Sequence, residues 1–490
     1  MRILLASSEV APFAKTGGLA DVAGALPKAL HALGHDVRVI LPKYRAVDAE
    51  KHRLRLLLPR LPVPIAWTVE NAAVWEGGIG DVPVYFVEQD SYFDREGLYQ
   101  VEGRDYPDNA ERFAFFSRAT LEASRALDFI PSVYHLNDWQ TALVPAYLRT
   151  VLRNDRALAN AGMLFTVHNL GYQGLFRPAA LAQADLPREL FTPSGMEFYG
   201  KANFLKAGLL WSDLINTVSR KYSQEIQTEE FGCGLEGVLQ ARATDVHGIL
   251  NGIDYEDWHP SHDRFLTARF SKDALAGKAA CKADLQQAFG LPVQADVPLL
   301  AVISRLAEQK GIDLVAEALD ALFALDTQLV LLGTGEPALH KAFEAAKVKH
   351  PARLGLKLGF DVALSHKIEA GADLFLMPSR YEPCGLNQMY SLVYGTIPVV
   401  RATGGLDDTI QRFDPKTGQG NGFKFAAATT EALLAAVREA VLLYRQPKRW
   451  ARLVQNAMAG DFSWERSARA YVALYEAIVK RRRGGVTPSA

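Results

Sequence analysis

The sequence has 490 residues, of which 49% are apolar and 22% are charged, and its formal net charge is −1. This composition is typical of a globular protein and excludes a disordered or fibrous chain, while the length predicts two domains. The near-zero net charge gives no general electrostatic attraction to nucleic acid or to an acidic membrane. No run of about 18 apolar residues is present to span a bilayer, so we expect a soluble protein without a membrane partner.

The cysteines and the N-terminal segment indicate the compartment. Cys233, Cys281 and Cys384 form no Cys-x-x-Cys pair and are odd in number, which favours a reducing environment and no structural zinc. The apolar start of the chain is interrupted at Ser7 and Glu9, and no small-residue cleavage site follows, so it does not resemble a signal peptide. We therefore expect a cytoplasmic protein.

The first half of the chain alternates strand-like and helix-like segments. A strand at 3–6, a helix at 18–33 that ends at Gly34, and a strand at 37–41 predict a β-α-β unit. Further strands are expected at 84–87, 132–136, 163–167 and 214–218, with helices near 109–127, 139–152 and 201–211.

A second alternating series begins with a strand at 298–304, a helix at 312–325 and a strand at 328–332, and strands recur at 356–358, 373–377 and 397–400. Turn residues interrupt the pattern between about 245 and 265. The sequence therefore predicts two Rossmann-like, doubly wound α/β domains, at 1–247 and 248–460. A Ser cap and helical apolar spacing predict an amphipathic helix within a final segment, 461–490.

The most informative motif is Ser379-Arg380-Tyr381-Glu382-Pro383-Cys384-Gly385-Leu386-Asn387-Gln388. It joins the buried strand at 373–377 to a helix expected at about 385–394. Glu382 is thereby placed at the carboxyl edge of a parallel sheet, where open α/β sheets bind ligands. A sugar hydroxyl is a suitable partner for this carboxylate.

A second motif, Lys15-Thr16-Gly17-Gly18-Leu19, directly follows the first strand and opens the first helix. Glycines allow a backbone to approach an anion, the start of a helix presents a positive dipole end, and Lys15 adds a cation. The alternative is that the glycines serve only to bend the chain.

These two motifs resemble the Lys-x-Gly-Gly-Leu and Glu-Pro-Cys-Gly-Leu-x-Gln motifs of bacterial glycogen synthases and plant starch synthases, and the resemblance covers essentially the whole chain. It implies a GT-B fold, with two Rossmann-like domains facing a central cleft: an acceptor-side domain first and a nucleotide-sugar donor-side domain second. The C-terminal helix would pack back on the first domain. The implied reaction transfers glucose from ADP-glucose to the non-reducing end of an α-1,4-glucan such as glycogen, with retention of configuration and without a cofactor. The preference for ADP over UDP rests on the resemblance alone.

Arg305 and Lys310 follow the first strand of the second domain, with the spacing of the family's diphosphate clamp. Arginine can grip a phosphate through two parallel hydrogen bonds, and lysine acts as a compact point charge. Without the resemblance, a surface pair beside Glu308 would be the simpler interpretation.

His168 and Asp138 each follow an expected strand. The resemblance implies that His168 contacts the transferred glucose and that Asp138 is the family's acidic residue near donor sugar and acceptor. The alternatives are a structural hydrogen bond for His168 and an N-cap of the helix beginning at Trp139 for Asp138.

Other positions are expected to bind substrate. Asn251 lies in an Asn-Gly-Ile-Asp turn that the family shares, and Thr403-Gly404-Gly405 is a second glycine pair that could face a distal phosphate. Tyr390 is separated from Glu382 by seven residues, the position at which many retaining transferases of this plan have a second glutamate. The set also includes Asp21, Tyr99, Asn169, Cys384 and Gly385, although Tyr99 is as easily a packing residue and a free cysteine is usually buried and apolar.

Three other classes of protein stay open. They are a phosphorylase-type enzyme with pyridoxal phosphate, a nucleotide-sugar epimerase and a non-catalytic glucan-binding homologue. No Asp-x-Asp cluster of the metal-dependent sugar transferases follows a strand, so no metal is expected. The absence of a clearly placed nucleophile favours attack from the face of departure, and a cleft between the domains implies closure around the donor.

Overall fold

The computed structural model describes residues 1–484, which divide into two compact α/β units. The first unit contains Met1–Val218, Ser223–Gly252 and the chain from Trp464 onward, and the second contains Ser219–Tyr222 and Ile253–Ser463. The last residues of the expected C-terminal segment, 485–490, lie outside the described residues. Within residues 1–484, no helix combines the length and the apolar character needed to cross a bilayer.

The first unit is built on a nine-stranded sheet with the order β14-β13-β9-β8-β1-β2-β5-β4-β3. The strands from β14 to β5 run parallel, whereas β4 and β3 are antiparallel additions at one edge. Their bounds are β1 (Arg2–Ala6), β2 (Asp36–Pro42), β3 (Arg55–Ile65), β4 (Thr68–Ile79), β5 (Val82–Glu88), β8 (Val133–Asn137), β9 (Gly162–Val167), β13 (Leu214–Thr217) and β14 (Val246–Gly248).

Helices cover both faces of this sheet. In β8, the ring of His135 lies 2.8 Å from the Tyr475 hydroxyl of α17, whereas the preceding residue, Tyr134, meets Ser124 of α3 at 2.6 Å. Because successive side chains of a strand point to opposite faces, α17 and α3 lie on opposite sides. The longer helices are α1 (Gly18–Ala32), α3 (Asn109–Ala126), α4 (Leu143–Arg149), α6 (Phe204–Trp211) and α17 (Trp464–Arg483).

Short elements fill the connections of this unit. They are α2 (Asp90–Phe93), β6 (Gln100–Val101), β7 (Arg104–Asp105), the 3-10 turn η1 (Trp139–Thr141), β10 (Leu175–Phe176), α5 (Ala180–Gln183), η2 (Arg188–Leu190), β11 (Glu197–Phe198), β12 (Lys201–Asn203), α7 (Arg220–Glu225), α8 (Glu236–Ala241) and η3 (Ala243–Asp245). The helix expected at 201–211 starts later than predicted, because 201–203 form β12 and the Asn203 side chain caps α6.

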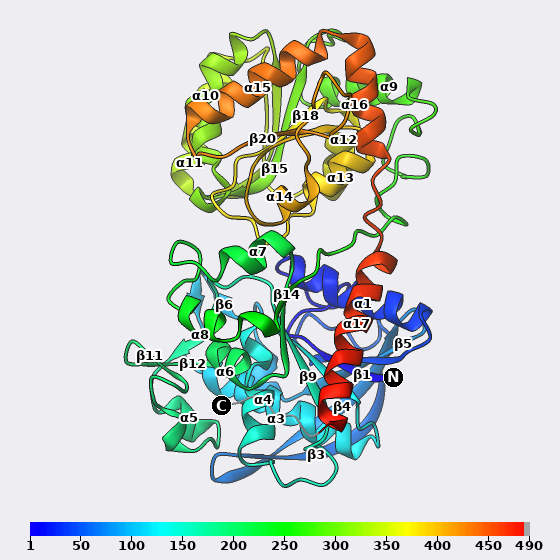
Figure 1. Ribbon diagram of the computed structural model, residues 1–490. Coiled ribbons are helices and arrows are strands. Elements are labelled where there is room, and N and C mark those ends of the chain that lie inside the picture. The colour runs from blue at the N-terminus through cyan, green and yellow to red at the C-terminus, as the bar shows by residue number, and fades with distance from the viewer. Residues whose placement is uncertain (485–490) are drawn as a thin grey trace. The chain divides into compact units, whose positions relative to one another are not determined.

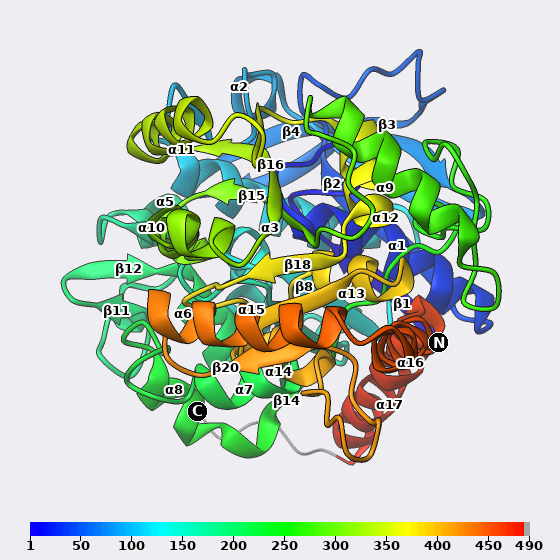
Figure 2. The same ribbon diagram turned by 90° about the horizontal axis from the view of Figure 1, so that it is seen from above.

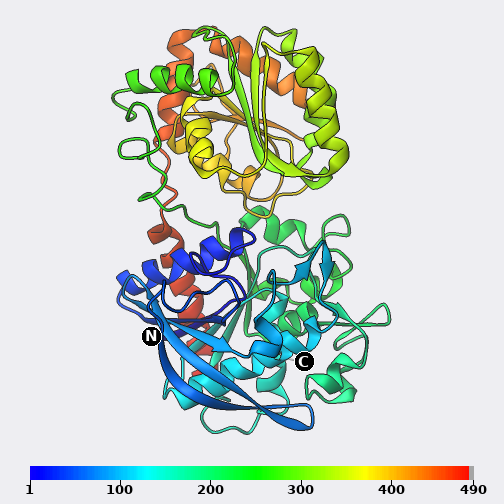
Figure 3. The ribbon, with the colours of Figure 1, turned by 180° about the vertical axis from the view of Figure 1, so that it is seen from behind.

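The long β3–β4 hairpin (Figure 3) was not predicted from the sequence. β3 contains Pro59, Pro62 and Pro64, and proline argues against a strand because it cannot donate to the hydrogen-bond ladder. β3 tolerates these prolines because it is the edge strand of the sheet.

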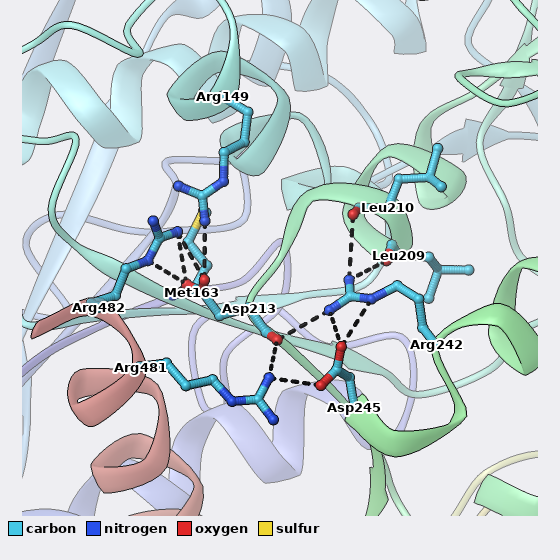
Figure 4. A network of polar contacts seen from close by, with 9 residues as sticks. All are labelled: Arg149, Met163, Leu209, Leu210, Asp213, Arg242, Asp245, Arg481 and Arg482. Carbon is cyan, nitrogen blue, oxygen red and sulfur yellow. Dashed lines mark hydrogen bonds and ion pairs between the residues drawn. The ribbon is translucent and has the colours of Figure 1, made fainter. Parts of the chain in front are cut away.

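The C-terminal helix α17 lies beside α1 and crosses β9 (Figure 1). Its last turn carries two arginines that reach acidic side chains of the same unit, the buried Asp213 and the partly exposed Asp245 (Figure 4). Arg482 bonds the Asp213 carboxylate at 2.8 Å and Arg481 bonds Asp245 at 2.7 Å. The last turn of α17 is thus fixed to the first unit by ion pairs, in addition to the apolar packing of the helix.

The second unit has a six-stranded parallel sheet with the order β17-β16-β15-β18-β19-β20. The strands are β15 (Leu299–Leu306), β16 (Gln328–Gly335), β17 (Leu354–Leu358), β18 (Leu374–Met377), β19 (Ile397–Arg401) and β20 (Phe423–Phe425). The helical elements are α9 (Ala276–Ala288), η4 (Glu308–Lys310), α10 (Ile312–Phe323), α11 (Pro337–Lys349), α12 (Val362–Gly371), α13 (Asn387–Val393), α14 (Gly404–Thr409), α15 (Thr430–Tyr444) and α16 (Pro447–Met458).

Alternate residues of β15 enter two separate cores. Leu300 and Val302 pack with α10 and α15 on one face, whereas Leu299 and Ala301 pack with α9 and α12 on the other. Figure 2 shows these helices on the two sides of the sheet. Because helices cover both faces of this sheet, a ligand can reach its residues only at the sheet's edges. The loops that follow β15, β18 and β19 lie at the carboxyl edge.

Candidate active site

In the second unit, Lys310 and Glu382 meet at the carboxyl edge of adjacent strands β15 and β18. The Lys310 ammonium donates to Oε2 of Glu382 at 2.6 Å, and the Ser379 hydroxyl donates to the same oxygen at 3.0 Å. Glu382 is only 5% exposed. Arg305 lies at the end of β15, exposed, with its guanidinium held by the Gln309 side chain at 3.2 Å. This edge therefore presents two cations beside one buried carboxylate.

Close backbone contacts hold the loops of this edge together. Gly311 has a φ of 65°, and a Cβ there would lie 2.1 Å from the Pro378 carbonyl oxygen, so only glycine fits. Arg380 pairs with Asp313 through two hydrogen bonds at 2.8 and 2.6 Å. The loop that carries Lys310 and the loop that carries Glu382 are thus fixed against each other.

Gly404 and Gly405 are required because two backbone segments approach each other closely at these positions. A Cβ at Gly404 would lie 1.8 Å from the Glu382 carbonyl oxygen, and one at Gly405 would lie 2.0 Å from that of Cys384. The Gly405 N–H donates to the carbonyl oxygens of Glu382 and Pro383. The glycine pair therefore supports the Glu382 loop, with Thr403 buried beside it at 1% exposure; its contact with a phosphate stays a prediction.

The helix after Glu382 begins at Asn387 rather than at about Gly385, because Gly385 has a φ of 72°, which a helix does not allow. Cys384 is 6% exposed, in keeping with a packing role. The ring of Tyr390 stacks on Trp258 at 3.9 Å, and Trp258 stacks in turn on His366 at 3.8 Å. The place of Trp258 between these two rings was not predicted from the sequence, because ring stacking between segments far apart in the chain leaves no local sequence pattern.

In the first unit, Asp138 and His168 follow neighbouring strands β8 and β9. The Asp138 carboxylate makes no capping hydrogen bond to η1, so the N-cap alternative is wrong. It accepts instead from the His168 N–H at 2.7 Å and from the Asn169 N–H. Asp138 also has a φ of 56°, a costly conformation for a residue other than glycine. Burial, with a contribution from the charge of Glu9, raises its pKa to about 7.

The hydrogen bonds around His168 define its tautomer. The Asn137 amide nitrogen donates to the Ala6 carbonyl at 3.0 Å, so the Asn137 oxygen faces Nε2 of His168 at 2.9 Å. An amide oxygen only accepts, and Nε2 must therefore carry the proton. Burial lowers the pKa of His168 to about 3, so the ring is neutral at physiological pH and Nδ1 keeps its lone pair. His168 can accept a hydrogen bond from a hydroxyl, but it is a poor general acid.

The glycine loop after β1 has space for a ligand. A Cβ on Gly17 or Gly18 would meet no atom within 4 Å, and Gly17 has an extended φ of −153°, so the bend alternative lacks support. Lys15 is exposed and its ammonium donates to Asp21 at 2.6 Å. Burial is the main cause of a raised pKa at Asp21.

Three further expected residues have defined surroundings in this unit. Asn251 is 6% exposed, and no described residue donates a hydrogen bond to its Oδ1. A buried oxygen without a hydrogen bond is unfavourable, and a donor group of a bound ligand would supply the missing bond. Asn169 accepts from the Gly171 N–H at 3.0 Å. Tyr99 donates its hydroxyl proton to Glu9 at 2.8 Å, so this group is committed within the protein. The contacts of Glu9 with the glycine loop and of Asn137 with His168 were not predicted from the sequence, although a carboxylate after a buried strand was a usable signal.

The described residues contain no cluster of three or more His, Cys, Asp or Glu side chains able to hold a metal ion. The described residues offer lysine and arginine side chains and backbone N–H groups that can bind a diphosphate.

Comparison with known families covers most of the chain. Residues 2–241 match the family described as starch synthase catalytic domain, and residues 286–457 match glycosyl transferases group 1. A protein of Syntrophotalea carbinolica named glycogen synthase is 52% identical over 482 residues, which are 98% of this chain and 99% of that protein. The chain belongs to the glycogen and starch synthase family.

Other members of the family agree over the same length. Glycogen synthase of an Anaeromyxobacter species is 53% identical over 479 residues, covering 98% of this chain and 99% of its own. The catalytic domain of starch synthase IV from Arabidopsis thaliana, solved with ADP and acarbose, superimposes with a TM-score of 0.90 at 36% identity, covering 98% and 99% of the two chains. The expected two-domain α/β fold of the GT-B type is confirmed, and the chain is a glycosyltransferase of this family.

Proposed function

We propose that this protein transfers glucose from ADP-glucose to the non-reducing end of an α-1,4-glucan, elongating glycogen with retention of configuration. The observation that carries the proposal is the contact of Lys310 with the buried Glu382 at the edge of β15 and β18. A nucleotide-sugar transferase needs an acceptor of sugar hydroxyl protons next to cations that stabilise a departing diphosphate. This edge supplies both.

Each residue has a specific role in this proposal. Glu382 accepts hydrogen bonds from glucose hydroxyls, while Arg305 and Lys310 stabilise the negative charge that grows on the leaving diphosphate. His168 accepts a hydrogen bond from a sugar hydroxyl at Nδ1, consistent with its Nε2–H tautomer. Asp138 orients the same sugar or the acceptor, and Lys15 with the first N–H groups of α1 contacts the diphosphate.

The proposed reaction proceeds on one face of the sugar. The bond between glucose C1 and the diphosphate oxygen breaks, the acceptor hydroxyl oxygen bonds to C1 from the same side, and its proton passes to the leaving phosphate oxygen. No protein nucleophile takes part, so a glucosyl group covalently bound to the chain during turnover would contradict this step. Accumulation of such an adduct is measured by intact-protein mass spectrometry with a slow acceptor.

We place this reaction in the cytoplasm. Support comes from the odd number of cysteines, which are free in the structure, Cys233 being exposed and Cys281 and Cys384 buried. Fractionation of the host cell with an antibody to the protein tests this location.

The first experiment mixes purified protein with glycogen and radiolabelled ADP-glucose, with UDP-glucose in parallel, and counts label in the precipitated polymer. Incorporation from ADP-glucose and little from UDP-glucose is the expected result. Loss of donor without label in the polymer would favour an epimerase, and visible absorbance of pyridoxal phosphate would favour a phosphorylase. Glycogen binding without turnover of either donor would indicate a non-catalytic homologue.

A further inference from the structure

Glu9 is a buried residue whose carboxylate binds the glycine loop. It lies just past β1, is only 4% exposed, and belongs to no expected site. Its carboxylate accepts from the backbone N–H of Thr16, from the Thr16 hydroxyl at 2.5 Å and from the Gly17 N–H at 3.1 Å. A single buried carboxylate thus holds the segment between Lys15 and the start of α1.

A second segment of the chain also donates a hydrogen bond to Glu9. The Tyr99 hydroxyl lies 2.8 Å from Oε1 of Glu9 and 2.7 Å from the Ser8 hydroxyl. Burial raises the pKa of Tyr99 well above its usual value, so the hydroxyl remains a donor to the carboxylate. The Tyr99 carbonyl accepts from Asn109 at 2.9 Å, and Asn109 accepts from the buried Arg112 at 2.7 Å. The carboxylate is therefore anchored to α3 as well as to the loop.

The bonds of Glu9 decide which N–H groups of the loop are available to an anion. The N–H groups of Thr16 and Gly17 are occupied by Glu9, whereas no described residue accepts from those of Gly18 and Leu19 at the start of α1. Gly18 is exposed and a Cβ there would meet nothing within 4 Å. These open donors come three and four residues after Lys15, whose ammonium is exposed.

We propose that Glu9 is a positioning residue that folds the Lys15–Gly18 loop so that the Lys15 ammonium and the N–H groups of Gly18 and Leu19 bind the diphosphate of the sugar donor. This inference rests on the proposed function and adds to it which groups of the loop act on the donor. A buried negative charge near an anion site is unfavourable by itself, but several N–H and O–H donors compensate its burial. Its benefit is that the loop is ordered before the donor binds, which lowers the entropic cost of binding.

The test is a double-mutant cycle of Glu9→Gln and Lys15→Ala, with kcat and KM for ADP-glucose measured at saturating glycogen. Glu9→Gln is expected to lower kcat/KM by about tenfold to a hundredfold, the scale of a misplaced binding group. If Glu9 acts through the loop, the loss that Glu9→Gln causes should be smaller in the Lys15→Ala background than in the wild type, because residues of one network are not additive. The loss that remains there reflects the N–H groups of Gly18 and Leu19. Additive losses, or wild-type kinetics for Glu9→Gln, would overturn the proposal.

A matched control is Glu122→Gln. Glu122 is a buried carboxylate of the same unit, 8% exposed, which pairs with Arg118 and Arg125 on α3. This variant is expected to lose thermal stability while keeping the KM for ADP-glucose. An equal loss of kcat/KM in both variants would assign the Glu9 effect to general destabilisation.

A readout independent of turnover separates this inference from the proposed function. Amide hydrogen exchange of residues 14–19, followed by mass spectrometry on the full chain, should accelerate at least tenfold in Glu9→Gln and remain unchanged in Glu122→Gln. Unchanged exchange in Glu9→Gln would overturn the proposal even if the wild type is inactive. A wild type that transfers no glucose would contradict the proposed function alone.

Discussion

The Lys310 ammonium lies 2.6 Å from the Glu382 carboxylate, and the two residues come from loops after neighbouring parallel strands. The pair joins the two loops by a hydrogen-bonded ion pair. Such an arrangement can exchange partners when a donor arrives, since the ammonium can turn to a phosphate while the carboxylate accepts from sugar hydroxyls.

Replacing Lys310 tests this edge. Lys310→Ala, and separately Arg305→Ala, should each lower kcat by about a hundredfold or more, the scale for removal of a preorganised charge stabiliser. Glucose incorporation from ADP-glucose measures the effect. Lys349→Ala is the control, because Lys349 forms an exposed ion pair with Asp320 in the same unit. Near-normal rates in a correctly folded Lys310→Ala variant would contradict its role in the site and support the surface interpretation.

Gly18→Ala separates a ligand role from a structural one. The added methyl group meets no atom within 4 Å, so the melting temperature should stay the same or rise slightly, since alanine favours a helix. The KM for ADP-glucose should rise by about tenfold or more, because the methyl group fills the approach to the N–H groups of the loop.

Gly24→Ala on the same helix should give the opposite pattern. Its Cβ would lie 2.6 Å from the Ala11 carbonyl oxygen, so the melting temperature should fall. Calorimetry and donor kinetics on both variants check this pair. A lower melting temperature with normal KM in Gly18→Ala would support the bend alternative.

The pH dependence should report Asp138. Its pKa of about 7 lies above the ordinary value of 3.8, so between these pH values the folded chain holds a proton that the unfolded chain releases. Stability from this group is therefore complete below pH 3.8 and is lost as the pH rises through about 7. Asp138→Asn should remove this fall, so that its stability relative to wild type is greater at pH 8 than at pH 4, as measured by thermal unfolding.

The same ionisation should appear in turnover. If the carboxylate form accepts from a sugar hydroxyl, kcat/KM rises with pH through about 7 in the wild type, and this limb is absent in Asp138→Asn. His168, with a pKa of about 3, should add no limb between pH 5 and 9. A limb that persists unchanged in Asp138→Asn would assign it to another group.

The end of α17 provides a stability prediction on the network in Figure 4. Among the described residues, Arg149 and Arg482 form ion pairs with the buried Asp213 carboxylate, and Arg482→Ala leaves the pair with Arg149 at 3.1 Å. Breaking a buried pair should cost about 3 kcal/mol and lower the melting temperature of the first unit.

The control for this prediction is Arg469→Ala on the same helix. Arg469 pairs with Glu465 and both side chains are 65% exposed, so the loss should stay within the small range of surface pairs. Equal melting temperatures for the two variants would show that the arginine of the last turn does not fasten α17.

Alternating apolar strands and amphipathic helices were enough to predict two doubly wound α/β folds. The strands of both sheet centres lie close to the expected ranges because buried parallel strands are continuous apolar runs. The β3–β4 hairpin was missed because its prolines and charged residues are typical of an edge, and edge position depends on the assembled sheet.

For the site, the chain alone was enough to predict which loops carry chemistry: a lysine and glycines after β1, an arginine and a lysine after β15, and a carboxylate after β18. These loops could be predicted because, within each sheet, the loops that follow parallel strands lie at the carboxyl edge. Which atoms meet depends on the folded structure. The Lys310–Glu382 contact, the His168 tautomer set by Asn137, and the grip of Glu9 on Gly17 depend on strand order and on hydrogen bonds between distant segments. Such contacts follow from packing in three dimensions, which no local pattern encodes.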